Sequence, residues 1–164
     1  MIEKTFPITE KLLSNGLKSA QKLFELLNAE SEQLKSRSNP TTINALATHK
    51  KDVVVQLEQF SKQLGQVLAT EKLPLNQDGV QNYLTKAKAN GFNIAQAHGQ
   101  WLNITQLTIN CRALNEKNGA SIDMLSRHAQ RALQVLRGKS QLATTYGPDG
   151  STRSELFSHT LISV

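Results

Sequence analysis

The chain has 164 residues, of which 38% are hydrophobic, 20% charged and 5% aromatic, with 9 Gly and 4 Pro. This length predicts one domain, and so few glycines and prolines argue against a turn-rich β protein. Lys and Arg (19) exceed Asp and Glu (13), for a net charge of +6, but the basic residues are scattered, which disfavours a nucleic-acid-binding protein. The only cysteine, Cys111, excludes an intrachain disulfide. Because no apolar run is long enough for a signal peptide or a membrane span, we expect a cytoplasmic protein.

The first predicted helix covers residues from about 9 to 36, with Thr9 as its N-cap. Its apolar positions alternate between spacings of four and three residues, which is the pattern of a coiled coil. We expect the helix to end before Pro40, because proline disfavours helix in the residue that precedes it. The predicted core-facing stripe is Leu13, Leu17, Ala20, Phe24, Leu27, Ser31 and Leu34.

The second predicted helix covers residues 40–71, with Asn39 as cap and Pro40 in the first turn. Its stripe continues the same spacing through Lys50, a charged residue at a core-facing position. Two interpretations of Lys50 stay open: its ammonium reaches water from the edge of the interface, or it is paired and fixes the register of the helices. The predicted stripe is Ile43, Leu46, Lys50, Val53, Leu57, Phe60, Leu64 and Val67.

A short helix is predicted over 79–89, capped by Asp78, and a long one over 92–137. The long helix would measure roughly 65–70 Å, whereas the first two measure roughly 45 Å each. We therefore expect part of it to project with an apolar stripe exposed, which is typical of a binding surface. Trp101 is expected to fill the bundle core, and Cys111 to be a small buried hydrophobe. The predicted stripe runs through Ile94, Ala97, Trp101, Ile104, Thr108, Cys111, either Leu114 or Asn115, Asn118, Ile122, Leu125, Ala129, Ala132 and Leu136.

The predicted fold class is all-α: an elongated antiparallel three-helix bundle with coiled-coil packing, a long third helix and a flexible C-terminal tail. Residues 1–137 would form the bundle and residues 138–164 the tail. The short turns between the helices favour antiparallel neighbours. Within the tail, the segment 145–150 has the proline and glycine of a turn.

The sequence lacks the usual marks of an enzyme. The four histidines are not spaced as metal ligands, no glycine-rich phosphate loop is present, and no carboxylate pair suggests acid–base chemistry. We therefore predict neither catalysis nor a cofactor. Two alternatives stay open: a basic nucleic-acid-binding helical protein, and a histidine phosphotransfer domain that uses His128, flanked by Arg127 and Arg131. Against phosphotransfer, Ala129-Gln130-Arg131 replaces the Leu-Lys-Gly-like step that usually follows the histidine in such domains.

Two asparagines and a glycine, Asn115, Asn118 and Gly119, depart from the apolar pattern within the long helix. An asparagine in a core needs hydrogen-bond partners, and a glycine inside a helix costs about 1 kcal/mol relative to alanine. Local rules broken together indicate either a functional site or a polar layer that sets helix register. Gly119 would also let another backbone approach closely.

The combination of Trp101, the run from Leu114 to Gly119 and the later Tyr146-Gly147-Pro148-Asp149-Gly150 resembles the FlgN family of bacterial flagellar export chaperones. The likeness covers nearly the whole chain and includes Lys50, although His49 stands where the family commonly has an acidic residue. The resemblance implies an ATP-independent cytoplasmic chaperone for the hook-associated proteins FlgK and FlgL. It would protect their disordered terminal segments and deliver them to the flagellar type III export gate.

The resemblance also implies where partners bind. Cargo would bind the end of the long helix and the residues just before it, and the tail would dock to the export gate. An exposed helix face would also allow self-association. The implied cargo-binding residues are Asn115, Asn118, Gly119, Ile122, Leu125, Ala129, Leu133 and Leu136. The implied gate-docking residues are Tyr146, Gly147, Asp149 and Gly150.

Overall fold

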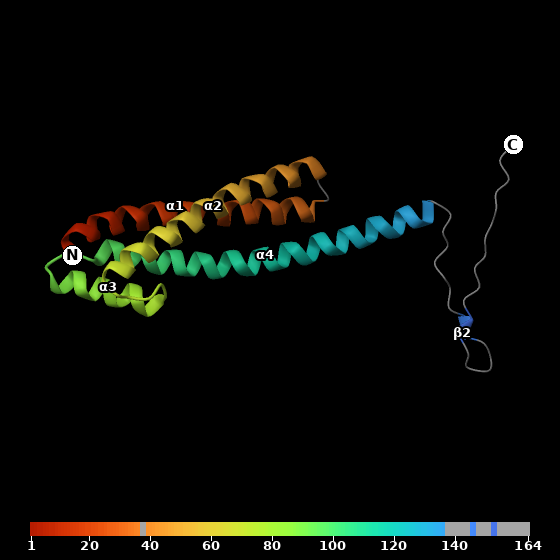
Figure 1. The fold of residues 1–164 in the computed structure, drawn as a ribbon. Coiled ribbons are helices and arrows are strands. Elements are labelled where there is room, and N and C mark those ends of the chain that lie inside the picture. Colours follow the sequence, from red (N-terminus) through yellow and green to blue (C-terminus); the bar gives the residue numbers. More distant parts are fainter. Residues whose placement is uncertain (37–38, 137–144, 147–151, 154–164) are drawn as a thin grey trace. The chain divides into compact units, whose positions relative to one another are not determined.

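The fold is all-α, as predicted. The computed structural model describes residues 1–36, 39–136, 145–146 and 152–153 (Figure 1). Its helices are α1 (Ile2–Lys35), α2 (Pro40–Thr70), α3 (Gln77–Ala89) and α4 (Ala95–Leu136). Two short strands, β1 (Thr145–Tyr146) and β2 (Thr152–Arg153), pair antiparallel, with Tyr146 opposite Thr152.

Contacts divide the chain into two units, Met1–Gly119 and Ala120–Val164. The predicted end of the bundle at residue 137 lies outside the described residues, as does most of the predicted tail, so this domain division stays a prediction.

The first helix begins at Ile2, and the prediction that it starts near Thr9 was wrong. Pro7 lies inside the helix, where a proline costs about 3 kcal/mol. Ile2 and Phe6 are buried in the core, and burying each contributes about 1.5–3 kcal/mol, which offsets that cost. Thr9 is not a cap: its buried hydroxyl lies 2.9 Å from the Thr5 carbonyl oxygen and 3.1 Å from the Tyr83 hydroxyl, and so links α1 to α3.

Helices α1 and α2 pack antiparallel within the Met1–Gly119 unit (Figure 1). Ser19 in the middle of α1 donates a hydrogen bond to Gln56, whereas Glu30, closer to the end of α1, pairs with Lys50, closer to the start of α2. The predicted cap of α2 is confirmed, because the Asn39 side chain accepts a hydrogen bond of 3.0 Å from the Thr41 N–H.

Helix α4 runs parallel to α1 over the stretch where the two helices meet. The Cys111 sulfur lies 4.0 Å from the Ala20 carbonyl oxygen, and Asn118 Nδ2 donates to the Leu27 carbonyl oxygen at 2.9 Å. Both pairs are separated by 91 residues, so the two helices advance in the same direction. Consequently α2 runs opposite to both of its long neighbours.

In this unit the structure confirms one of the two predicted stripe positions of α4. Every seventh residue is buried, starting at Ala97 and continuing through Ile104, Cys111 and Asn118. The other stripe position is more open, since Trp101 is half-buried and Thr108 and Asn115 are exposed.

The hydrophobic core lies where α3 covers the start of α1 and the end of α2. Its largest fully buried side chain is Tyr83. The prediction that Trp101 fills the core was wrong, because this side chain is half-buried and packs against the core from its edge. Gly79 at the start of α3 is required, since an added Cβ would lie 1.9 Å from the Pro74 carbonyl oxygen. The core members are Ile2, Phe6, Leu13, Leu64, Val67, Leu68, Val80, Tyr83, Leu84, Ala87, Ala97 and Ile104.

Candidate functional site

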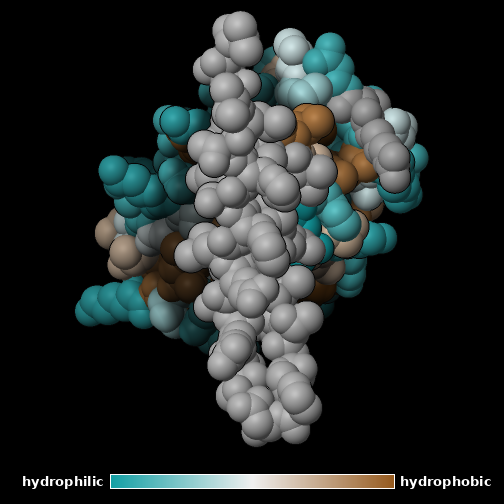
Figure 2. All heavy atoms as spheres, turned by 90° about the vertical axis from the view of Figure 1, so that its right-hand side faces the viewer, coloured by the Kyte–Doolittle hydropathy of each residue, from teal (hydrophilic) through white to brown (hydrophobic). Residues whose placement is uncertain are grey.

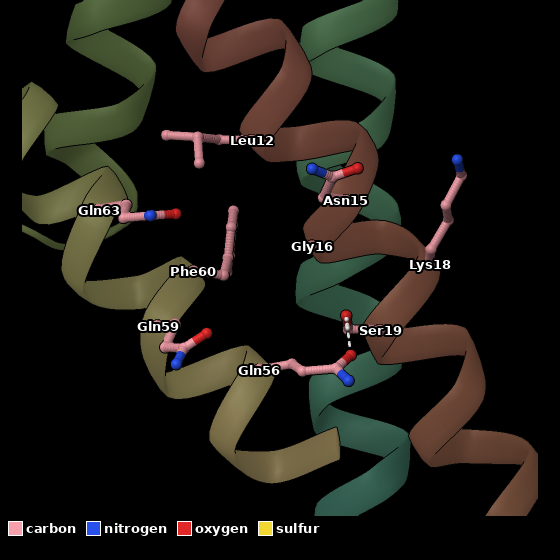
Figure 3. A pocket seen from close by; sticks show the side chains of 9 residues that line it. All are labelled: Leu12, Asn15, Gly16, Lys18, Ser19, Gln56, Gln59, Phe60 and Gln63. Atoms are coloured by element: carbon pink, nitrogen blue, oxygen red, sulfur yellow. Dashed lines mark hydrogen bonds between the residues drawn. The ribbon is translucent and has the colours of Figure 1, made fainter. Parts of the chain in front are cut away.

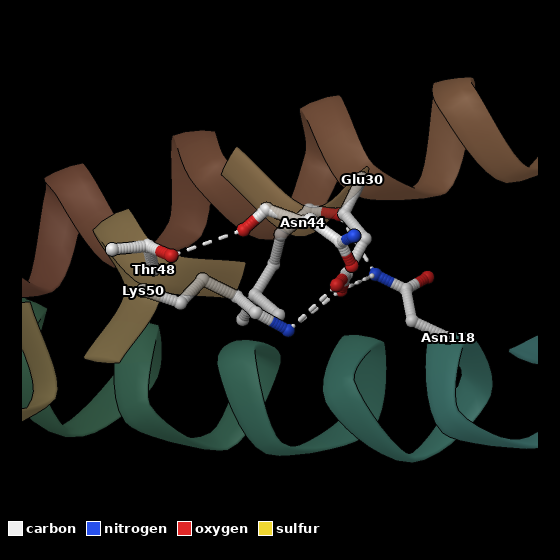
Figure 4. Close-up of polar contacts among 6 residues, drawn as sticks. Glu30, Asn44, Thr48, Lys50 and Asn118 are labelled. Atoms are coloured by element: carbon white, nitrogen blue, oxygen red, sulfur yellow. Dashed lines mark hydrogen bonds and ion pairs between the residues drawn. The ribbon is translucent and has the colours of Figure 1, made fainter. Parts of the chain in front are cut away.

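A buried polar cluster, formed by Glu30, Lys50 and Asn118, joins the three long helices (Figure 4). The Lys50 Nζ lies 2.7 Å and 2.9 Å from the two Glu30 carboxylate oxygens. Asn118 Nδ2 donates to Glu30 Oε2 at 2.9 Å and also to the Leu27 carbonyl oxygen. The Glu30 side chain is 1% exposed and that of Lys50 19% exposed, so this carboxylate has little access to water.

This geometry decides between the two interpretations of Lys50. The ammonium is paired with Glu30 rather than released to solvent, so Lys50 compensates a buried charge. His49, next to Lys50, is exposed and takes no part in the pair.

The cluster also assigns a role to Asn118. An asparagine amide has two N–H donors, and here Nδ2 has two acceptors, on Leu27 and Glu30. Because Asn118 is buried, a partner could contact it only if this layer opened. Asn118 therefore positions α4 on α1, which is the register-setting alternative.

Asn115 and Gly119 lie at the surface of the same helix. Both are exposed, and a Cβ added to Gly119 would meet nothing within 4 Å among the residues outside its immediate surroundings. No described segment of the chain packs closely against Gly119, so the space beside this glycine is open to a partner.

The C-terminal stripe, defined as Ile122, Leu125, Ala129, Leu133 and Leu136, follows along α4 in the second unit. At 100° per residue these five positions fall within about 80° of the helix circumference. Leu125 is half-buried and the other four are exposed. Among the residues of 120–136 whose side chains the structure describes, none is buried. The stripe is therefore an exposed apolar face.

Among the grooves of the Met1–Gly119 unit, two lie along the long helices. The polar groove between α1 and α2 has a volume of about 390 Å³ and is lined mainly by amide and hydroxyl side chains around Phe60, whose ring packs over Gly16 (Figure 3). The apolar groove, of about 590 Å³, lies between α1, α2 and α4. Hydrophobic side chains also reach the surface among hydrophilic ones in Figure 2. The apolar groove is lined by Ala20, Leu23, Leu27, Ala47, Lys50, Lys51, Val54, Leu57, Thr108, Cys111, Arg112 and Asn115.

The titratable side chains of the described part of the chain bear on the sites considered from the sequence. No group of three His, Cys, Asp or Glu residues there is placed to hold a metal ion. His128 is exposed on α4, and Arg127 Nε donates to the Asp123 carbonyl oxygen at 3.3 Å. Burial raises the pKa of the Cys111 thiol, which makes it a poor nucleophile.

The predicted gate-docking residues fall mostly beyond the described chain. Tyr146 belongs to strand β1, while Gly147, Asp149 and Gly150 lie outside the described residues. Their role stays a prediction.

Sequence comparison assigns the chain to a family. The sequence model of the family described as FlgN protein matches residues 1–154. The chain belongs to the FlgN family. FlgN proteins are flagellar export chaperones and not a family of enzymes. Comparison with curated proteins and with solved structures gives no match. Within the residues described for this FlgN chain, no helix is both long and apolar enough to cross a membrane.

Two features of this FlgN chain were missed by reasoning from the sequence. Glu30 was not recognised as buried, because it lies beside Ser31 on the predicted stripe and an isolated glutamate is usually solvated. The signal for it was Lys50, whose core-facing position calls for a counter-charge on a neighbouring helix. The apolar groove was missed because it depends on how far apart α2 and α4 lie over α1.

Proposed function

We propose that this FlgN protein acts in the cytoplasm and binds the disordered terminal segments of the hook-associated proteins FlgK and FlgL. It protects these segments from aggregation and delivers them to the flagellar export gate. The family supports a chaperone role in flagellar export, and the observation that supports a segment-binding site is the exposed C-terminal stripe. Ile122, Leu133 and Leu136 are large hydrophobic residues that stay open to solvent.

The chemistry of the stripe suits an amphipathic partner segment. Side chains that recur along one helix face pack against the apolar face of a second helix without any bound nucleotide. A segment that folds only on binding loses conformational entropy as it does so, which moderates its affinity. Moderate affinity favours release at the gate. We place Asn115 and Gly119 at the edge of this cargo site because both are exposed on the same helix.

A matched pair of substitutions tests the cargo site. Leu133 is 50% exposed and belongs to the stripe, whereas Met124 is 53% exposed and points about 160° away from Ile122 at 100° per residue. We expect Leu133→Asp and Leu125→Asp each to weaken binding of purified FlgK and FlgL at least about tenfold, because a buried leucine contributes about 1.5–3 kcal/mol. Met124→Asp should bind like the wild type. Pull-down and titration calorimetry measure this.

Circular dichroism of each variant controls for folding. The C-terminal stripe is not the cargo site if both leucine variants keep their helicity and still bind FlgK and FlgL with wild-type affinity. Equal losses in the leucine variants and in Met124→Asp would likewise remove the assignment to this face.

A further inference from the structure

The apolar groove is built as a receptor for an elongated apolar object. Its floor consists of the buried residues Ala20, Leu27 and Cys111. Its walls carry Leu57, which is half-buried, and Val54, which is exposed. The hydrophobic side chains that line it are thus only partly covered by the helices around them.

The dimensions of the groove match a helix. Its lining on α2 extends from Ala47 to Leu57, which is about 15 Å at 1.5 Å per residue, or nearly three helical turns. On α4 the lining includes Thr108 and Asn115, which lie seven residues apart and are exposed. This heptad spacing puts both residues on one face of α4, where they could pack against one further helix. A helix laid here would convert three packed helices into four, a common bundle.

The charge of the groove selects the kind of helix. Lys50, Lys51 and Arg112 line the groove, and no carboxylate does. Lys50 is held by Glu30, and Arg112 Nε lies 3.1 Å from Glu116 Oε1. Lys51 is exposed and makes no ion pair within the described part of the chain. An occupant with acidic residues beside its apolar stripe would complement this rim, whereas a second copy of a chain with net charge +6 would not.

We propose that the apolar groove binds an amphipathic helix of a partner protein whose apolar stripe is bordered by acidic residues. This second docking surface lies on α1, α2 and α4 within Met1–Gly119. It contains no residue of the C-terminal stripe, and Asn115 is the residue at which its lining meets the edge of the proposed cargo site. It gives the chaperone a place for a partner other than a hook-associated segment.

The test uses the full chain and a synthetic helical peptide of 21 residues, a length of about six turns. The peptide carries leucines at the a and d heptad positions and glutamates at e and g. A second peptide carries lysines in place of the glutamates, and a third has the acidic composition in scrambled order. Fluorescence anisotropy of labelled peptide measures binding. We expect the acidic amphipathic peptide to bind and the other two to bind at least about tenfold more weakly.

Two neighbouring valines provide a matched pair of variants. Val54 lines the groove and is 40% exposed, while Val55 is 44% exposed and does not line it. Because both side chains are open to water, aspartate at either position should leave the fold intact. Val54→Asp should weaken binding of the acidic peptide at least about tenfold, because apolar contact is lost and like charges repel each other. Val55→Asp should leave binding unchanged.

Two further readouts locate the bound peptide. Lys51→Glu should weaken binding of the acidic peptide and make its affinity depend less on salt concentration, because one attraction that salt screens is removed. Cys111, the single thiol of the chain and part of the groove floor, is buried and reacts slowly in the free protein. Its reaction with an excess of maleimide, followed to completion, should be slower still when the acidic peptide is bound. Leu133→Asp, which disrupts the C-terminal stripe, should change neither readout.

Several results would overturn the proposal. The groove is not the site if Val54→Asp and Val55→Asp weaken binding equally, or if the bound peptide leaves the reaction of Cys111 unchanged. Equal affinity for the lysine peptide removes the acidic specificity. Concentration-dependent dimerisation that Val54→Asp abolishes would assign the groove to a second copy instead. Loss of peptide binding in Leu133→Asp would place the peptide at the cargo stripe, while failure of FlgK and FlgL binding alone leaves the groove unaffected.

Discussion

At the scale of single residues, the two partners of the buried ion pair, Glu30 and Lys50, contribute unequally to the stability of the bundle. The carboxylate is almost wholly buried, while the lysine keeps access to solvent along part of its side chain. Removing one charge of a buried pair leaves the other unpaired, and the cost depends on whether the remaining charge can reach water. The two partners should therefore respond differently to substitution.

We expect Lys50→Met to destabilise the protein by about 3–5 kcal/mol, because Glu30 is left as a buried and unpaired charge. Glu30→Gln should cost only about 1–2 kcal/mol. The glutamine oxygen can still accept from Asn118, and the Lys50 ammonium can turn toward solvent. Urea unfolding followed by circular dichroism measures both free energies of unfolding.

The double variant Glu30→Gln with Lys50→Met is the control for this asymmetry. It should be more stable than Lys50→Met alone, because the buried charge is gone. A double variant as unstable as the sum of the two single variants would show that the pair is not coupled, and equal costs for the two single variants would contradict the difference in burial.

The polar cluster could be predicted from the sequence only in part. Lys50 and Asn118 were both recognisable as polar residues on apolar stripes. A paired role was one of two alternatives for Lys50, and a register-setting polar layer was one of two for Asn118. The sequence could not show that both meet the same carboxylate. That meeting depends on the relative translation of α1, α2 and α4, which a periodic pattern does not specify, since each helix can slide by a heptad and keep its stripe.

At the scale of one element, helix α4 contains a glycine, Gly119, that the packing of the helix does not require. An added Cβ at Gly79 would overlap the Pro74 carbonyl oxygen, whereas at Gly119 it would enter open space. A helix-interior glycine without a close neighbour lowers helix stability by about 1 kcal/mol relative to alanine. Under the proposed cargo site, this cost at Gly119 is explained by a partner that needs the space.

Gly119→Ala should therefore raise the free energy of unfolding by about 0.5–1 kcal/mol and at the same time weaken binding of FlgK and FlgL. Thermal unfolding and calorimetric titration measure the two effects on the same preparation. Gly79→Ala is the contrasting variant, and it should destabilise the protein because a backbone atom has to move. A Gly119→Ala protein that is more stable and binds cargo normally would remove Gly119 from the cargo site.

The existence of the helices followed from the sequence more reliably than their ends and their core did. The heptad of α4 was predicted through Ala97, Ile104 and Cys111, because burial at this spacing follows from helix geometry alone. The start of α1 was missed because Pro7 is a local signal against helix, and the tertiary burial around it outweighs that signal. Trp101 was expected at the centre because of its size, but Tyr83 on the short helix α3 occupies that place.

At the scale of the whole molecule, a delivery chaperone has to hold cargo and contact the export gate in one complex. The proposed cargo stripe belongs to helix α4, and the proposed gate-docking tyrosine to strand β1. Under this proposal, different elements of one chain would carry the two functions. A tyrosine is suited to a docking role because it buries a large area for little loss of rotamer entropy. The two functions should then be separable by mutation.

Tyr146→Ala is the substitution that tests this separation. It should leave the affinity for FlgK and FlgL unchanged, because Tyr146 is not part of the helical stripe, and it should reduce export of both proteins in a flagellated host strain that depends on this chain. Leu133→Asp should reduce cargo binding and export together. Calorimetry with purified cargo and quantification of FlgK and FlgL in culture supernatants measure the two effects. If Tyr146→Ala lowers cargo affinity as much as Leu133→Asp does, the tyrosine belongs to the cargo site and the division between helix and tail is wrong.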